Sequence, residues 1–156
     1  MAPRLQTDYR APASIWTNPR NARTHGRRQI DQIAESIHAF GFTNPILVDE
    51  ADMIIAGHGR LAAAQQLGLS EVPVIRIAHL SDHQKRALML ADNKIALNAG
   101  WDMEILAAEL AELSSTEIDL DIDLTGFEMG EIDVILDGAG GKGGDEPETA
   151  PLPDPN

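Results

Sequence analysis

The sequence predicts a mixed α/β (α+β) fold of short strands and packed helices, followed by an acidic helical segment. Short apolar runs bounded by Gly, Pro or Asn alternate along the chain with segments of helical period. A length of 156 residues is enough for a domain with an apolar core. Aromatic residues make up only 4% of the chain, which predicts that the core consists of Ile, Leu, Val and Ala.

The first segment is rich in Pro and Arg and has no sustained period. We expect a flexible basic arm over 1–13 and a short strand near 14–16. The first clear helix has apolar residues at helical spacing, and Gly41 follows it as a typical C-terminal residue. The expected buried face of this helix is Ile30, Ile33, Ile37 and Phe40.

Three strands are predicted in the next part of the chain. An Asn-Pro pair at 44–45 marks a turn before a strand over 46–48. A polar hairpin tip over 49–52 leads to a returning strand over 53–56. The third strand covers 72–77 and has a Pro near its start, where a strand tolerates it.

Three helices are predicted between and after these strands. The first ends at Gly68, and the second begins with a capping box formed by Ser81 and Gln84 and runs to about residue 95. Asp102 can cap the third. The expected buried faces are Leu61, Ala64 and Leu67 in the first, Ala87, Leu88, Ala91 and Ile95 in the second, and Ile105, Leu106, Leu110 and Leu113 in the third.

The C-terminal part is acidic and then rich in Gly and Pro. Strict alternation over 118–124 predicts a strand or extended segment with an acidic face, and 131–136 predicts a last short helix. The alternating Asp residues also suggest calcium, although the central Gly and terminal Glu of an EF-hand loop are absent. We expect residues 138–156 to lack regular structure and to link this chain to a further domain, or to be a frayed terminus.

These patterns divide the chain into four parts. We expect the basic arm over 1–13, the α/β domain over 14–96, an acidic helical appendage over 97–137 and the linker over 138–156. The absence of Cys excludes disulfides, thiolate metal sites and a Cys nucleophile. No apolar run approaches the roughly 20 residues of a membrane span, and the N-terminus has no secretory signal. We therefore expect a cytoplasmic protein with no membrane partner.

Charge is distributed unevenly along the chain, whose net charge is −13. Residues 1–94 contain eleven basic residues (Lys and Arg) and nine acidic residues (Asp and Glu). Residues 95–156 contain one basic residue and sixteen acidic residues. An acidic C-terminal half should repel nucleic acid, because duplex binding depends largely on phosphate neutralisation. The basic front either contacts nucleic acid or an acidic partner, or it is an arm that is solvated or folded back on the acidic half. The candidate DNA-binding residues are Arg20, Arg23, Arg27 and Arg28.

The segment 54–64 predicts a strand, a tight turn and a helix N-terminus in immediate succession. Backbone N–H groups and the positive end of the helix dipole favour anions at such a turn. Gly57 and Gly59 would permit a positive φ and a close ligand approach, and Arg60, expected to be exposed, adds a planar fork that fits phosphate. His58 can donate, accept or titrate. The alternative is a tight strand–helix connection with a surface Arg.

Three sequence boxes from about Ser14 to Ala96 resemble the N-terminal domain of ParB-like proteins, the ParB/sulfiredoxin fold. Residues 41–48 resemble the first box, with Asn44 where Gln is usual. Residues 55–63 resemble the phosphate-binding box, in which Gly57 and Arg60 match, His58 replaces Glu and Gly59 replaces Arg. Residues 90–93 resemble the Glu-Asn box, with Asp92 for Glu and Ala96 in place of its closing Arg.

The Gly-His-Gly-Arg form of residues 57–60 and the run over 91–102 more closely resemble a branch that precedes a DNA methyltransferase domain in phage-like and mobile-element proteins. This resemblance extends to about Leu136, and the Gly/Pro linker lies where the methyltransferase would be joined. The resemblance thus implies DNA as a partner, through a fused methyltransferase domain, and a homodimer as a further possibility. The acidic helices that follow the domain would make a poor reader of the major groove.

The resemblance also implies CTP or another nucleotide with Mg²⁺ as the ligand. Gly57, His58, Gly59 and Arg60 would then hold the phosphates together with Asn44 and Asn93, and Asp92 would face the metal. The missing basic side chains at Gly59 and Ala96 should weaken triphosphate binding. Alternatives are slow nucleotide hydrolysis, a metal-dependent nuclease with His58 and Asp92 as catalytic candidates, and a DNA-targeting scaffold. Sulfiredoxin chemistry and thiol-based cofactors are excluded, since the chain has no Cys.

Overall fold

A computed structural model describes residues 2–140 and divides the chain into two compact units. Unit 1 is Met1–Gly100 and unit 2 is Trp101–Asn156. The division follows Gly100, whereas the sequence placed a boundary at 96/97, which lies inside a helix. Unit 1 contains, in order, β1 (Thr7–Arg10), the 3₁₀ helix η1 (Pro12–Ser14), α1 (Arg27–Phe40), β2 (Ile46–Val48), β3 (Ile54–Ala56), α2 (His58–Leu67), β4 (Val72–Arg76) and α3 (Asp82–Asn98).

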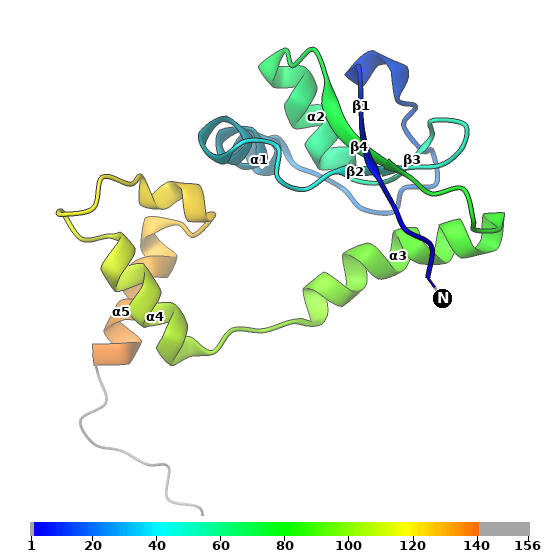
Figure 1. Ribbon diagram of the computed structural model, residues 1–156. Helices are drawn as coiled ribbons and strands as arrows, with labels where there is room; N and C mark the ends of the chain where they lie inside the picture. Colours follow the sequence, from blue (N-terminus) through cyan, green and yellow to red (C-terminus); the bar gives the residue numbers. More distant parts are fainter. Residues whose placement is uncertain (1, 141–156) are drawn as a thin grey trace, which may run out of the picture. The chain divides into compact units, whose positions relative to one another are not determined.

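The four strands form one mixed sheet in the order β1-β4-β2-β3 (Figure 1). β1 is antiparallel to β4, β4 is parallel to β2, and β2 is antiparallel to β3. After β2, the chain passes through β3 and α2 and then forms β4, which pairs with β2 in parallel. Trp16 bridges to Met53, so the segment after η1 is also bonded at the β3 edge of the sheet.

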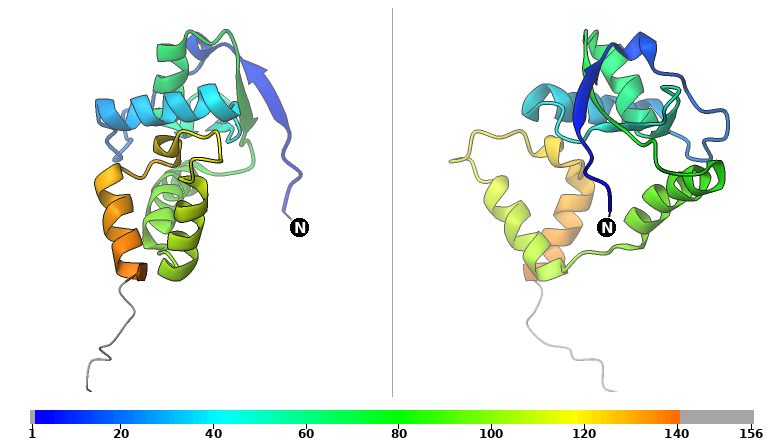
Figure 2. Two further views of the ribbon diagram at one scale, coloured as in Figure 1. Left: turned by 90° about the vertical axis from the view of Figure 1, so that its left-hand side faces the viewer. Right: turned by 45° about the vertical axis from the view of Figure 1, so that its right-hand side comes forward.

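Alternation along the strands divides the core of unit 1 between the two faces of the sheet. Ile46 and Val48 pack with Leu61 and Ala64 of α2, on the face that also buries Ile15. α1 packs in turn against α2 (Figure 2). The other face carries a second buried cluster of Ile55, Ile77 and Met89, against which Leu47, Ile75, Leu80 and Leu88 pack.

Several expected elements are present with the expected ends. The strand over 46–48 is confirmed, and the strands expected over 53–56 and 72–77 appear as β3 and β4. α2 ends at Gly68, which has a left-handed φ of 68°. The capping box of α3 is formed, with Gln84 N–H donating to Ser81 Oγ and Ser81 N–H donating to Gln84 Oε1.

Other expectations were wrong at the N-terminus and in α3. Residues 7–10 of the expected flexible arm form β1, because β4 offers them a strand to pair with. The strand expected near 14–16 is instead the end of η1 followed by an isolated bridge. α3 buries Met89 rather than Ile95, which is 68% exposed, because only the first part of the helix packs on the sheet.

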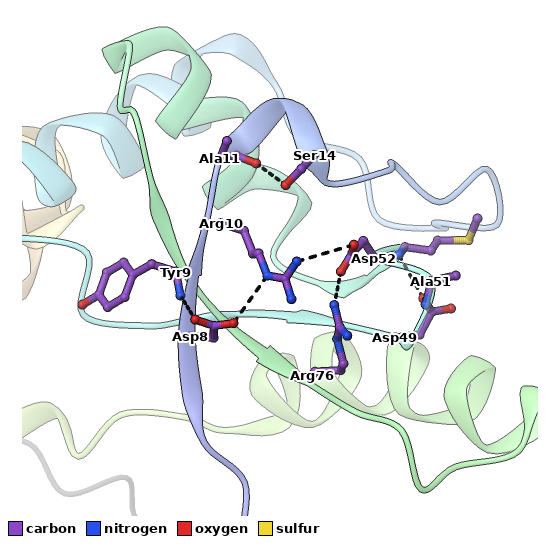
Figure 3. A network of polar contacts seen from close by, with 10 residues as sticks. Asp8, Tyr9, Arg10, Ala11, Ser14, Asp49, Ala51, Asp52 and Arg76 are labelled. Carbon is purple, nitrogen blue, oxygen red and sulfur yellow. Dashed lines mark hydrogen bonds and ion pairs between the residues drawn. The ribbon is translucent and has the colours of Figure 1, made fainter.

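An ion-pair network joins β1, the β2–β3 turn and β4 (Figure 3). Arg76 Nη2 lies 2.6 Å from Asp52 Oδ1, and Arg10 Nη1 lies 3.9 Å from Asp52 Oδ2. Arg10 Nε also lies 3.5 Å from Asp8 Oδ2. The side chains are partly exposed, so each pair contributes little alone, and the network mainly positions the turn, in which Asp52 has a φ of 60°.

Unit 2 has its own small apolar core. It contains α4 (Met103–Leu113), the 3₁₀ helix η2 (Ile122–Thr125) and α5 (Met129–Gly140). Leu106, Leu110 and Ile132 are buried between these elements, and Trp101 meets Phe127 edge-on with ring centroids 5.4 Å apart. Asp102 caps α4 as predicted, by accepting from the N–H groups of Glu104 and Ile105.

Two expectations for the C-terminal part were also wrong. The segment 118–124 is not a strand, because Asp121 accepts from Asp123 N–H and begins η2 instead. The helix expected over 131–136 is present, but it extends over Met129–Gly140, so residues 138–140, which we expected to lack regular structure, belong to α5. The rest of that linker, 141–156, lies outside the described residues. Within residues 2–140, no helix combines the length and apolarity needed to cross a bilayer.

The packing of α2 on the sheet gives a prediction for stability. Leu61 is 1% exposed in the first core cluster, whereas Leu90 on α3 is 59% exposed. Leu61→Ala should lower the free energy of unfolding by about 2–5 kcal/mol, because it leaves a cavity between α2 and the sheet. Leu90→Ala, the matched control, should change it little. Urea denaturation measures both, and equal effects of the two substitutions would contradict this account of the core.

Candidate functional site

A cavity of about 440 Å³ in unit 1 gathers polar residues that are far apart in the sequence. Its walls come from the segment before α1, the loop before β2, the first turn of α2, and α3. Leu47 and Ile75 form its apolar wall, on the same face of the sheet as the Met89 cluster. The polar residues that line it are Arg23, Asn44, Arg60, Asp92 and Asn93.

The turn between β3 and α2 depends on Gly57. This residue has a φ of 107°, in the left-handed region that favours Gly, so the predicted positive φ is confirmed there. The N–H of Leu61 donates to Gly57 O at 2.9 Å and closes the first turn of α2. The N–H groups before it have no acceptor within the helix, so the start of α2 is a positive end.

Arg60 is folded over this turn rather than extended into solvent. Its Nη2 donates to Pro45 O at 3.1 Å, and a Cβ at Gly57 would lie only 3.0 Å from the same Nη2. Burial lowers the pKa of Arg60, while the charge of Asp92 raises it. The guanidinium remains charged at neutral pH, since the ordinary pKa of Arg is far above 7. The expectation of an exposed Arg60 was therefore wrong, because the side chain is half-buried.

The Nε of Arg60 is buried and has no hydrogen-bond partner within residues 2–140. A buried guanidinium donor without an acceptor is costly, and a bound ligand, ion or water can supply the acceptor. Arg60 thus combines one structural bond, to Pro45, with unused donor capacity beside the cavity.

Gly59 has a different role from the one expected. It is buried, and it is not among the described residues with positive φ. A Cβ at this position would lie 3.0 Å from both His25 Nδ1 and Ile33 Cδ1. Gly59 therefore allows α2 to pack closely against the middle of α1 and the segment before it, and the expected positive φ was wrong here.

The ring of His58 holds the backbone of the segment between η1 and α1 at Asn18. Asn18 N–H donates to His58 Nε2 at 3.3 Å, and Asn18 Nδ2 lies 3.4 Å from Ile54 O. Burial lowers the pKa of His58, with a smaller effect from the nearby His25. The ring is therefore neutral at pH 7 and acts as an acceptor. His58 is not among the residues that line the cavity, so the structure does not assemble it there with Asp92.

Asp92 and Asn93 form the wall contributed by α3. Asn93 Nδ2 donates to Met89 O at 2.9 Å, which leaves its side-chain carbonyl oxygen to accept. Asp92 is exposed and is the only carboxylate among the residues lining the cavity. Within residues 2–140 there is no group of three or more His, Asp or Glu placed to hold a metal ion. A cation at Asp92 would consequently take its other ligand oxygens from water, amide carbonyl groups or a bound phosphate.

The four candidate DNA-binding arginines are in different positions. Arg23 lines the cavity, and its backbone is held by reciprocal bonds with the Asn21 side chain. Arg20 follows the Asn18 turn, and Arg27 and Arg28 occupy the first turn of α1. The N-terminus of a helix is the positive end of its dipole, so a cation there is unfavourable. The side chains of Arg27 and Arg28 place two positive charges at this end of α1.

The sequence analysis did not predict that Arg23 lines this cavity, and it did not predict the apolar wall formed by Leu47 and Ile75. Leu47 and Ile75 could have been found from strand alternation. Leu47 lies between the buried Ile46 and Val48 of β2, and Ile75 follows the buried Val74 of β4, so each faces away from its buried neighbour. The position of Arg23 depends on the fold of the irregular segment before α1, for which no sequence period gives a signal.

Two family models match the chain in succession. Residues 9–94 match the ParB N-terminal domain, and residues 104–156 match the ParB-methyltransferase HTH domain. This chain belongs to the ParB N-terminal domain family. The two matches fall within unit 1 and unit 2 respectively.

Curated relatives agree with this assignment for unit 1. The ParB-like nuclease domain-containing protein YnaK of Escherichia coli is 46% identical over 86 residues, which are 55% of this chain and 99% of that protein. A probable chromosome 2-partitioning protein ParB of Deinococcus radiodurans is 42% identical over 80 residues. That match covers 49% of this chain but only 26% of the partitioning protein.

A solved structure shows the same fold. A C-terminally truncated chromosome-partitioning protein ParB from Caulobacter crescentus, complexed with CTP-γ-S, has a TM-score of 0.69. The match covers 84% of this chain and 77% of that one at 21% sequence identity. The predicted fold class, with its ParB/sulfiredoxin-like domain, is confirmed.

The close packing at Gly59 gives a second prediction. Gly59→Val should lower the free energy of unfolding by about 1–3 kcal/mol, because the new side chain overlaps His25 and Ile33. Gly100→Val is the matched control, since a Cβ at Gly100 meets nothing within 4 Å. Thermal and urea denaturation measure the difference. A Gly59→Val protein as stable as Gly100→Val would show that α1 and α2 do not need this close approach.

The environment of His58 predicts a pH dependence of stability. Its pKa in the folded protein lies below the ordinary 6.5, so the unfolded chain binds more protons at acid pH. The neutral His58 ring should therefore contribute fully to the free energy of unfolding above about pH 7. This contribution should be lost progressively as the pH falls below 6.5. His58→Gln, which retains an acceptor, should show a smaller loss in urea denaturation between pH 7 and pH 5. Identical pH profiles would contradict the buried neutral imidazole.

Proposed function

We propose that unit 1 binds a nucleoside triphosphate, with CTP as the first candidate, in the cavity beside Arg60. The observation that carries the proposal is the convergence of a positive helix end and a charged Arg60 opposite Asp92 and Asn93. A volume of about 440 Å³ lies within the range of small-molecule sites. The complex of the Caulobacter ParB with CTP-γ-S supports the choice of ligand.

Each polar residue of the cavity has a separate task in this proposal. Arg60 and Arg23 donate charge-assisted hydrogen bonds to phosphate oxygens, and the N–H groups at the start of α2 add to them. Asn44 and Asn93 supply neutral polar contacts. Asp92 supplies the single carboxylate for Mg²⁺, which ordinarily binds one or two carboxylates together with phosphate oxygens.

The residues of this site can be explained by ligand binding alone, without a catalysed reaction. His58 accepts a hydrogen bond from the Asn18 backbone and is not among the cavity's lining residues, so the nuclease alternative has less support. Gly57 and Gly59 act through the backbone, by shaping the turn and by allowing α2 to approach α1. Binding of nucleotide, rather than its hydrolysis, is therefore the proposed activity.

The wider proposal is that the chain is an accessory module of a DNA-modifying protein. The match of residues 104–156 to a ParB-methyltransferase HTH domain supports the proposal of a fused DNA methyltransferase, which we place among phage or mobile-element proteins on the resemblance of the sequence. DNA contact by this chain would come from the basic residues of unit 1. Arg20, Arg27 and Arg28 are the candidates that lie outside the residues lining the cavity.

Arg60→Ala tests the nucleotide site. Loss of its charge-assisted bonds should weaken nucleotide binding by about 1.5–3 kcal/mol, roughly ten- to over a hundredfold. Calorimetric titration with CTP, ATP and GTP, each with and without Mg²⁺, measures the effect. Because Arg60 also bonds to Pro45, circular dichroism must show that the variant is folded at the titration temperature.

Two further variants complete this test. Arg86→Ala removes an exposed Arg of α3 that does not line the cavity, and it should leave affinity unchanged. Asp92→Asn should reduce the increase in affinity that Mg²⁺ provides, with little effect in its absence. The proposal is wrong if no nucleotide produces a binding signal with the wild-type protein, or if Arg86→Ala weakens binding as much as Arg60→Ala.

A further inference from the structure

A second and larger cavity lies within unit 2. It is a groove of about 900 Å³ between α4 and α5, which lie side by side (Figures 1 and 2). Small and apolar side chains form most of its surface, which we call the α4–α5 groove. Its principal lining residues are Met103, Ala107, Ala108, Ala111, Val134 and Ile135.

The α4–α5 groove leaves large apolar side chains exposed. Met103 is 53% exposed and Val134 is 72% exposed, one on each wall. The small side chains of Ala108 and Ala111 on α4 leave room between them and α5. A contiguous apolar surface of this kind, bounded by polar residues, is typical of a site that binds another molecule.

The charges of unit 2 restrict what this molecule can be. Residues 101–140 include twelve Asp and Glu and no Lys, Arg or His. Glu104 lines the groove itself. Glu112 follows Ala108 by four residues and Asp137 follows Val134 by three, so both carboxylates are neighbours of groove residues on their own helices. The groove is thus apolar along its length and negatively charged around it.

Three other occupants fit this charge pattern poorly. Duplex DNA needs Lys and Arg to neutralise its phosphates, although the family model that matches residues 104–156 is described as an HTH domain. A second copy of unit 2 would bring the same negative charges together. Residues 141–156 contain four acidic residues, one Lys and a single large apolar residue, Leu152, so they offer little to an acidic, apolar groove.

We propose that the α4–α5 groove binds a cationic amphipathic helix of a partner protein. The apolar face of that helix would cover Met103 and Val134, with residues at i, i+3, i+4 and i+7 along the groove. Lys or Arg beside this face would pair with Glu104, Glu112 and Asp137. α4 has eleven residues, about 16 Å in length, which matches a partner segment of about three turns.

Model peptides test the proposal with the full chain. The first is a 14-residue peptide of Leu and Lys with Leu at helical spacing, labelled for fluorescence anisotropy. The second has the same composition in an order without amphipathic period, and the third keeps the Leu positions but replaces Lys with Glu. Only the first should bind strongly, with at least about tenfold higher affinity than either control, and its affinity should fall as salt increases.

Two variants locate the binding. Ala108→Arg places a large cation in the groove and should weaken binding of the first peptide at least about tenfold. Ala87→Arg, which adds the same charge at an exposed position of α3, is the matched control and should leave most of the affinity. Val134→Gln changes an exposed residue on the other wall of the groove and should also weaken binding of the first peptide. It replaces Ala108→Arg in the test if that variant does not fold.

The remaining occupants are separate outcomes, each of which overturns the proposal. A dimer in sedimentation velocity that Ala108→Arg dissociates would assign the groove to a second copy. Affinity for a 20-base-pair duplex that changes with Ala108→Arg, but not with Ala87→Arg, would assign it to DNA. Tighter peptide binding by Leu152→Gln would assign it to residues 141–156. Absence of peptide binding, or equal binding of all three peptides, also overturns it.

Discussion

The backbone turn at Gly57 is the constraint on which the arrangement of unit 1 depends. Its left-handed conformation ends β3 and begins α2 without an intervening loop. The side chain of Arg60 then lies close over the turn, with Nη2 3.0 Å from where a Cβ at Gly57 would be, and it bonds to the carbonyl of Pro45 before β2. One turn thereby fixes α2 on the first core cluster and places a cation and a positive helix end beside the cavity.

The two units differ in the charge that they can use for binding. Unit 1 contains all the Arg residues of the chain, and its cavity combines two of them with a single carboxylate. Unit 2 contains no basic residue through position 140 and has an apolar groove in place of a polar cavity. An anionic ligand therefore suits unit 1, and a cationic apolar partner suits unit 2. The two proposed ligands therefore differ in charge as the two units do.

Local sequence signals predicted those elements whose ends have a local cause. The capping box at Ser81, the cap at Asp102 and the left-handed Gly68 each determine a helix end within a few residues. Alternation failed over 118–124 because a strand needs a partner, and none pairs with it among the described residues; Asp121 caps a 3₁₀ turn instead. β1 was missed for the opposite reason, since its partner β4 follows it by more than sixty residues.

By itself, the sequence determined the fold class, the family and the turn at Gly57, because each depends on residue types at short, fixed spacing. The tertiary structure decided which residues meet. It placed Arg23 and Arg60 on the same cavity, assigned Gly59 to helix packing and bonded His58 to the Asn18 backbone. These contacts depend on how α2 and α3 pack on the sheet and how α1 packs on α2. Burial and distance between remote segments are properties of that packing, and no local pattern encodes them.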